Sequence, residues 1–399
     1  MQSRHSGAVP KCQSIGEPTF MKPLLLAEFE EMRERNLLEL ADAHKAGRKV
    51  VGTYCLYSPT ELIVAAGAIP VSLCGTRQTP IPAAEKYLPR NICPLIKSSF
   101  GAAVTDTCPY FYFADLLVAE TTCDGKKKMY ELLGKLKPLH LMQLPQTQEG
   151  EDAFRYWYGE VVRFKSRLEE DLGVTITDAG LQSAIQLLNE ERQALADLQD
   201  VCKHIPSPIS GVDLLAALHI RSFCIDKRDA ILMLNRLTAE LRNIVTTGSS
   251  PFQPDAPRIL LTGVPVGTGS DKVIRIIEES GGSVVCLESC SAYKKVDPVD
   301  EHFDPLTAIA EKYLRTPCSC MSPNTGRLEL VARLAREFAV DGIIDLTWQA
   351  CHTYNLESFT LQQGLQKHHD LPFLQIETDY SEGDSEQLRV RIEAFLEMI

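Results

Sequence analysis

The sequence predicts an α/β protein built from two doubly wound parallel sheets. Short apolar runs that suit buried strands alternate with amphipathic helical patterns. The same order of strands and helices occurs twice, and a long, purely helical stretch separates the two copies. Alternating strand and helix units form parallel sheets with right-handed connections. We therefore expect an internal duplication of a flavodoxin-like domain, with the two domains joined by a helical connector.

The first copy occupies residues 21–150 and follows residues 1–20, for which we expect a flexible leader. An amphipathic helical pattern opens the domain, and the strand KVVGT follows it. A helix comes next, for which Ser58 is the expected N-cap and Pro59 the first helical residue. The runs AIPVSL, DLLVAE and KPLHLMQLP supply the other strands of this domain.

Residues 151–250 form the predicted helical connector, because apolar residues recur there at helical spacing with charges between them. Residues 251–399 form the second domain. It starts after the Gly-, Ser- and Pro-rich segment TTGSSPFQPDAP. Its strands are RILLTGV, SVVCLES, GIIDLTW and PFLQIET, with helical patterns between them.

Composition narrows the class of protein. The 399 residues carry a net charge of −12, which argues against nucleic-acid or anionic-membrane partners. The first residues contain no apolar segment of the kind found in signal peptides, and no apolar run is long enough to span a bilayer. We therefore expect a cytoplasmic protein, in which the 13 cysteines would stay reduced.

Two cysteines occupy equivalent places in the two domains. In DLLVAETTC and DGIIDLTWQAC, a buried strand ends in small polar residues, then Cys123 or Cys351, then a helical pattern. Parallel sheets bind ligands at the carboxyl ends of their strands, and helix N-termini favour anions such as thiolate. Thiolates select iron–sulfur clusters, zinc or copper(I), and the absence of a CxxC pair argues against a zinc ribbon. The alternative is that the cysteines are scattered core residues, which we prefer for Cys12, Cys202, Cys224 and Cys286.

Several long motifs resemble one family. GTYCLYSPTELIVAAGAIPVSLC, LPRNICPLIKSSFG, CPYFYFADLLVAETTCDGKKKMYELL, QACHTYNLE and IETDYS occur in the order found in the 2-hydroxyacyl-CoA dehydratase and benzoyl-CoA reductase superfamily. The ensemble is most similar to the double-cubane cluster proteins. The resemblance covers residues from about 49 to the C-terminus. It implies two flavodoxin-like domains, a homodimeric assembly, and a protein that works under anaerobic conditions.

The resemblance also implies ligands. In the dehydratases three cysteines hold one [4Fe–4S] cluster, and the matching positions here are Cys93, Cys123 and Cys351. In double-cubane proteins two cubanes share a sulfide, giving [8Fe–9S], and each keeps three cysteines. For the second triple we assign Cys55, Cys290 and Cys320, which lie near strand ends or helix starts. Three alternatives stay open: Cys318 in place of Cys320, and Cys74 or Cys108 in place of Cys55.

Other residues near these cysteines have two interpretations each. Lys126, Lys127 and Lys128 would balance sulfide charge or guide an electron donor, or would form a solvated helix face. His352 is a candidate proton or hydrogen-bond donor, with a structural role as the alternative. Glu120 and Glu377 are candidates for proton relay, with a cap or ion-pair role as the alternative.

The segment GVPVGTGSDK lacks the GK[ST] ending of a phosphate-binding loop, so we interpret it as a tight strand-to-helix turn. This agrees with the resemblance, which implies that a separate iron–sulfur activator hydrolyses ATP and delivers the electrons.

Three functions follow. The first is a low-potential iron–sulfur reductase of the double-cubane type that acts on a small molecule. The second is a 2-hydroxyacyl-CoA dehydratase subunit with one [4Fe–4S] cluster, which eliminates water through a ketyl radical. The third is a non-catalytic cluster carrier or redox sensor.

Overall fold

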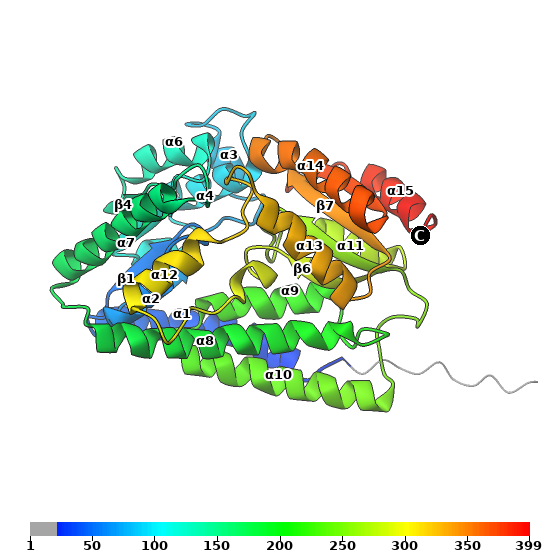
Figure 1. Ribbon diagram of the computed structural model, residues 1–399, viewed down its shortest axis with the longest axis horizontal. Helices are drawn as coiled ribbons and strands as arrows, with labels where there is room; N and C mark the ends of the chain where they lie inside the picture. The colour runs from blue at the N-terminus through cyan, green and yellow to red at the C-terminus, as the bar shows by residue number, and fades with distance from the viewer. Residues whose placement is uncertain (1–21) are drawn as a thin grey trace, which may run out of the picture.

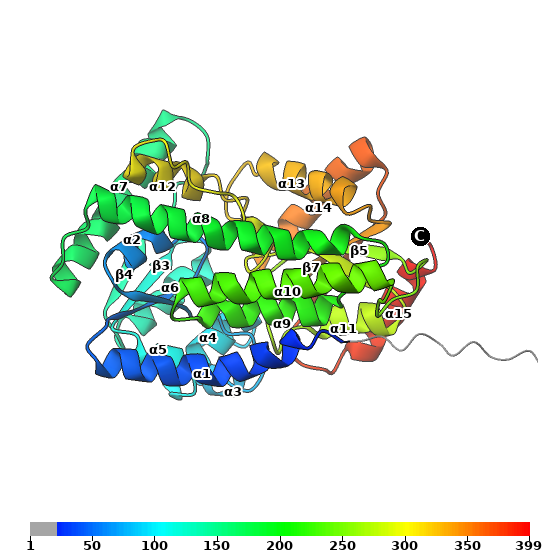
Figure 2. The same ribbon diagram turned by 90° about the horizontal axis from the view of Figure 1, so that it is seen from below.

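The computed structural model describes residues 22–399, so the predicted leader and Cys12 lie outside the described residues. Two sheets stand side by side, each with its own helices, and long helices run beneath both of them (Figures 1 and 2). Within residues 22–399, no helix is both long and apolar enough to cross a membrane.

The first sheet is parallel and has the strand order β2-β1-β3-β4. Its strands are β1 (Val50–Thr53), β2 (Ile69–Ser72), β3 (Leu116–Glu120) and β4 (Leu139–Met142). β3 is buried along its whole length, as expected for a central strand covered on both faces. Together with its helices, this sheet forms the first lobe. The helices of this lobe are α1 (Leu25–Lys45), α2 (Thr60–Ala65), α3 (Ile81–Ala84), α4 (Pro94–Val104), α5 (Pro109–Phe113) and α6 (Asp124–Leu133).

The second sheet repeats this arrangement. Its order is β6-β5-β7-β8, and all neighbouring strands are parallel. This is the order of the first sheet, with β5 to β8 in the places of β1 to β4. Its strands are β5 (Arg258–Gly263), β6 (Ser283–Glu288), β7 (Gly342–Trp348) and β8 (Phe373–Thr378). Its helices are α11 (Lys272–Glu279), α12 (Pro305–Leu314), α13 (Thr325–Glu337), α14 (His352–His369) and α15 (Ser385–Leu396). The prediction of two flavodoxin-like parallel-sheet domains is confirmed.

Four helices connect the two sheets: α7 (Glu151–Leu172), α8 (Asp178–Asp200), α9 (Gly211–Ile220) and α10 (Lys227–Thr247). In Figure 1, α8 and α10 run along the lower edge beneath both sheets. α8 packs on α2 of the first lobe and on α12, and α9 packs on β6 of the second lobe. The connector therefore fixes the two sheets relative to each other.

One helix of the second half of the chain packs on the first lobe. α12 contacts α7 and α8. The Trp157 indole donates to the Ala310 carbonyl over 3.1 Å, and the Tyr57 hydroxyl donates to the Thr316 carbonyl over 3.0 Å. The α12 residues Ile309 and Tyr313 share a hydrophobic core with the first sheet. The loop that follows α12 is therefore held against the first lobe.

The start of α2 differs from the prediction. Pro59 is the N-cap, and Ser58 forms no cap hydrogen bond because its hydroxyl donates to the buried Glu120 carboxyl of β3. A buried carboxyl without a hydrogen-bond donor is costly, because no water reaches it. The first amides of α2 have other partners, so the Ser58 hydroxyl bonds to Glu120 and does not cap the helix. Thr60 N, for example, donates to the Tyr313 hydroxyl over 3.1 Å.

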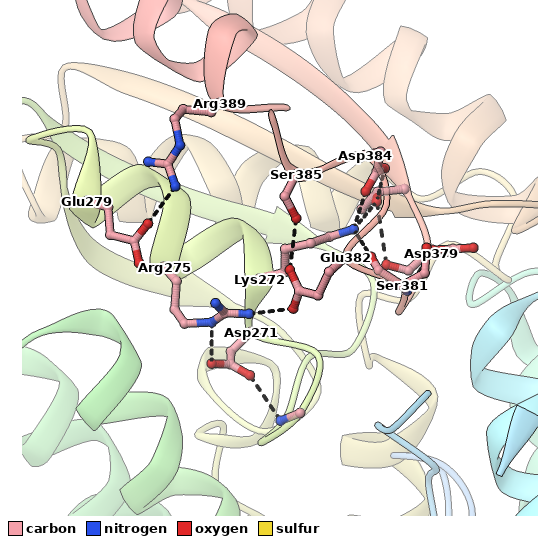
Figure 3. Close-up of polar contacts among 12 residues, drawn as sticks. Asp271, Lys272, Arg275, Glu279, Asp379, Ser381, Glu382, Asp384, Ser385 and Arg389 are labelled. Atoms are coloured by element: carbon pink, nitrogen blue, oxygen red, sulfur yellow. Dashed lines mark hydrogen bonds and ion pairs between the residues drawn. The ribbon is translucent and has the colours of Figure 1, made fainter. Parts of the chain in front are cut away.

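The segment GVPVGTGSDK is a turn between β5 and α11, and its lysine is already engaged. Lys272 Nζ donates to Thr378 Oγ1 over 2.8 Å, and also to the Ser381 carbonyl and Asp384 (Figure 3). Arg275 pairs with Glu382 beside it. This lysine holds the loop after β8 in place and is not available to a phosphate.

Candidate functional site

Seven cysteines line one cavity between the two lobes. The cavity has a volume of about 660 Å³, which lies within the roughly 300–1,000 Å³ typical of cofactor and small-molecule sites. The thiols in its wall are those of Cys55, Cys93, Cys123, Cys290, Cys318, Cys320 and Cys351. The structure thus brings together all six cysteines that we assigned as ligands, together with the alternative Cys318.

Three of these cysteines are helix N-caps. Cys93 precedes α4, Cys123 precedes α6, and Cys351 precedes α14. The Cys123 sulfur accepts a hydrogen bond from the Lys126 amide at 3.5 Å, which is the capping contact that an anionic sulfur would strengthen. The first turns of three helices therefore point their partial positive charge at the sulfurs.

The other four thiols come from strand ends and from the α12–α13 loop. Cys55 lies two residues beyond β1, and Cys290 lies two residues beyond β6. Cys318 and Cys320 come from the loop that the packing of α12 holds against the first lobe. The Cys320 thiol contacts the Tyr57 hydroxyl at 3.8 Å, and the same hydroxyl is bonded to Thr316.

Thiols from the two halves of the chain meet in the cavity. Cys93 of the first half and Cys351 of the second interact there, and the interaction lowers the pKa of Cys351 to about 7 and raises that of Cys93. Cys318 and Cys320, both from the α12–α13 loop, also interact, which lowers the pKa of Cys318 to about 6 and raises that of Cys320. One thiol of each pair is therefore poised to ionise near neutral pH.

The remaining cysteines of the described chain lie elsewhere. Cys74 is bound through its thiol to the Tyr54 carbonyl at 2.9 Å, and Cys108 caps the short helix α5; neither lines the cavity. Cys202, Cys224 and Cys286 are buried in the hydrophobic core. Cys74 and Cys290 hold equivalent positions, two residues beyond β2 and β6, yet only Cys290 lines the cavity, so the two halves are not equivalent there.

The three lysines after Cys123 have different environments. Lys126 is buried, lines the cavity, and donates to the Tyr54 carbonyl over 3.2 Å. Burial lowers the pKa of Lys126, but the nearby Tyr130, Cys55, Cys74 and Cys123 groups outweigh this effect and raise it. Lys127 and Lys128 are exposed and pair with Asp124 and Glu131. Only the first of the three is a buried cation among the thiols.

A buried charge network supports the second-lobe wall of the cavity. Arg327 of α13 bridges Glu288 of β6, Asp345 of β7 and Glu357 of α14, and its guanidinium lies over the Tyr354 ring. Lys294 pairs with Glu288 at 3.0 Å and donates to the Tyr354 hydroxyl over 2.9 Å. Tyr354 lines the cavity, so the network fixes this part of the wall. Sequence patterns gave no sign of this network, because its members lie far apart in the chain and only the fold brings them together.

The three candidate proton donors differ in position. His352 is exposed and lines the cavity beside Cys351. Glu120 is fully buried behind Ser58, and burial raises its pKa to about 7. It is outside the cavity wall. Glu377 is exposed at the end of β8, where it accepts a hydrogen bond from Asn355 at 3.0 Å, and it is also outside the wall.

The donor set suits a cluster better than a mononuclear metal. Among the side chains that the structure describes (residues 22–367 and 370–399), no three of His, Cys, Asp or Glu converge as they would on a single metal ion. An iron–sulfur cluster instead distributes its cysteines over several irons, so its ligands surround a volume. A cavity with seven thiols, a buried cation and three helix N-termini fits such a group in its chemistry.

Comparison with known proteins places this arrangement in a family. The family model of the 2-hydroxyglutaryl-CoA dehydratase D-component matches residues 55–399. The chain belongs to that family. A protein of Escherichia coli (strain K12) with the provisional name of dehydratase subunit YjiM is 44% identical over 378 residues, which cover 94% of this chain and 98% of that protein.

More distant members of the superfamily include both dehydratases and a reductase. The (R)-phenyllactyl-CoA dehydratase beta subunit of Clostridium sporogenes is 24% identical, with 89% of this chain and 93% of that protein covered. A subunit of the benzoyl-CoA reductase of Thauera aromatica is 23% identical, with 42% of this chain and 44% of that protein covered. The superfamily that the motifs predicted is therefore confirmed.

Proposed function

We propose that this chain is a low-potential iron–sulfur reductase of the double-cubane type that reduces a small molecule. The observation that supports this most strongly is the number of thiols around one cavity. A single cubane of this family needs three protein thiolates, whereas seven line the cavity here. Electrons would come from a separate ATP-hydrolysing iron–sulfur activator, since the turn at Lys272 offers no free lysine for a nucleotide phosphate.

The thiols divide between two triples. Cys93, Cys123 and Cys351 would hold one cubane, each at the N-terminus of a helix. Cys55, Cys290 and Cys320 would hold the other, with Cys318 as the alternative to Cys320. The bound cluster would supply electrons at low potential to the substrate.

The protein's own residues would set the environment of that chemistry. Ile96 and Trp348 are buried apolar side chains in the wall and exclude water. Lys126 supplies positive charge against the thiolates from the side of the first lobe. His352, exposed at the cavity, is the group in the wall best placed to pass a proton between solvent and substrate.

Iron and sulfide analysis of protein purified without oxygen tests the proposal. We expect about eight irons per chain, and about four would instead support the single-cubane dehydratase subunit. Activity with a competent activator separates the remaining class, because a carrier or sensor would bind iron and reduce no substrate.

The dehydratase alternative is favoured by names, because two of the three relatives described above are called dehydratase subunits. It would require an acyl-CoA to bind near the cavity and a dissimilar second subunit. Saturable binding of an acyl-CoA together with about four irons per chain would support this alternative. A homodimer, measured by sedimentation, would favour the reductase.

A further inference from the structure

A second, smaller cavity lies on the other side of Cys55. It has a volume of about 60 Å³ and is lined by the ends of β1 and β2, by α8 and by α12. Since a water molecule needs roughly 10–15 Å³ on this measure, the space holds a few waters or one small ion. Among the described residues, Cys55 alone lines both cavities.

The wall of this cavity is strongly basic. One carboxylate, that of Glu191, faces five cationic side chains: Arg192, Arg221, Lys227, Lys295 and Lys312. Arg192 is already neutralised from behind by Glu61, to which it is bonded. Glu191 serves two cations at once, since its Oε1 lies 3.0 Å from Arg221 Nη1 and 3.5 Å from Lys227 Nζ. Positive charge therefore exceeds negative charge in the wall.

Arg221 is the residue that points most clearly to a missing ligand. It is only 3% exposed, yet its Nε and Nη2 atoms are buried and have no hydrogen-bond partner in the described chain. Leaving the donors of a buried charged group unmatched is costly, so a native protein normally supplies a partner. The partner must be an acceptor, because guanidinium groups only donate.

Lys295 and Lys312 add two more cations that lack a carboxylate partner, and the Lys312 Nζ lies over the Tyr313 ring, 4.1 Å from its centroid. Each is partly exposed, so an ion can reach it from solvent, and neither forms an ion pair with a carboxylate of residues 22–399. Burial, together with the charge of Arg221, lowers the pKa of Lys295 to about 8. Burial and the charge of Arg192 lower the pKa of Lys312 to about 7. Burial is the larger cause of both shifts, and the neighbouring guanidinium is the second, which an anion in the cavity would oppose.

We propose that this cavity binds one small tetrahedral oxyanion of the phosphate or sulfate type. Arginine donors match the oxygens of such an ion, and Lys295 and Lys312 would complete its neutralisation. The volume is too small for a whole nucleotide, so the ligand of this proposal is the inorganic ion. The bound ion would place negative charge next to Cys55, in the wall shared with the larger cavity. The proposal does not depend on the reductase assignment.

Calorimetric titration of the anaerobically purified full chain with inorganic phosphate tests this, in a buffer without other oxyanions. We expect one phosphate per chain, and a melting temperature that rises with phosphate concentration. Lys295→Met with Lys312→Met should weaken binding at least about tenfold, since two charge-assisted contacts are lost. This double variant orphans no carboxylate, so we expect it to fold and to melt no lower than the native chain without phosphate.

The matched control removes the same charge elsewhere. Lys45→Met with Lys128→Met changes two exposed lysines and should bind phosphate as the native chain does. Competition by sulfate would support the tetrahedral class, whereas competition by acetate alone would contradict it. Absence of binding at millimolar phosphate, or equal binding by the Lys295/Lys312 double variant, would overturn the proposal.

Discussion

Replacing Arg327 by methionine should destabilise the second lobe more than any other single ion-pair substitution on α13. The side chain is 1% exposed and lies between two fully buried carboxylates, Glu288 and Asp345. After the substitution Glu288 would keep Lys294 as a partner at 3.0 Å. Asp345 would have none, since Arg327 is its one ion-pair partner among residues 22–399.

The expected cost follows from that orphaned charge. Removing one partner of a buried ion pair destabilises proteins by about 3–5 kcal/mol, because a charge stays buried without compensation. Urea denaturation followed by tryptophan fluorescence measures the loss. The chain has two tryptophans, so a Trp157→Phe background leaves Trp348 of β7 to report on the second sheet.

Arg333 provides the control on the same helix. It is 45% exposed in its side chain and pairs with Glu337 at 3.0 Å, so Arg333→Met should cost about 0.5 kcal/mol or less. Adding Asp345→Asn to Arg327→Met should recover part of the loss, because the orphaned charge is then gone. A loss below about 1 kcal/mol for Arg327→Met, or no recovery in the double variant, would show that Asp345 does not depend on this ion pair.

Three further outcomes are expected. Cys93→Ala or Cys351→Ala should lose most of the bound iron, whereas the core variant Cys202→Ala should keep it; full iron in either of the first two would remove them as ligands. Burial raises the pKa of Glu278 in the folded protein to about 7, which is above its value in the unfolded chain. The free energy of unfolding that Glu278 contributes should therefore fall as the pH rises from about 4.5 through 7. Glu278→Gln should therefore lose less stability than the native chain across that interval, a difference of roughly 1–3 kcal/mol in urea denaturation, and identical pH profiles would contradict the assignment. Gly101→Ala should cost about 1–3 kcal/mol of stability, because the new Cβ would lie 2.0 Å from the Pro80 carbonyl oxygen. In the control Gly326→Ala the new Cβ meets no atom within 4 Å, so this variant should be neutral or stabilising. Equal melting temperatures for the two variants would be inconsistent with this packing.

Local sequence patterns were sufficient for the two sheets and for part of the site. A buried apolar run fixes a parallel strand, and its end fixes where the following residues emerge, which is why Cys123 and Cys351 could be assigned to one edge of each sheet. The repeated order of the runs then predicted the duplicated topology.

Features that depend on packing between distant segments could not be predicted in the same way. The helical pattern of α12 does not reveal that it packs on the first lobe, yet this packing brings Cys318 and Cys320 beside Tyr57. The equivalence of Cys74 and Cys290 by position likewise does not reveal that only Cys290 lines the cavity. Ser58 suits a helix cap locally, but the buried Glu120 carboxyl takes its hydroxyl.

We expect thiols from both lobes to surround one iron–sulfur cofactor, and quantitative iron and acid-labile sulfide analysis would detect it. Oxygen-free protein should contain about eight irons per chain, with sulfide in near-equal amount. Protein that contains no iron after anaerobic purification and reconstitution, while remaining folded, would contradict the claim.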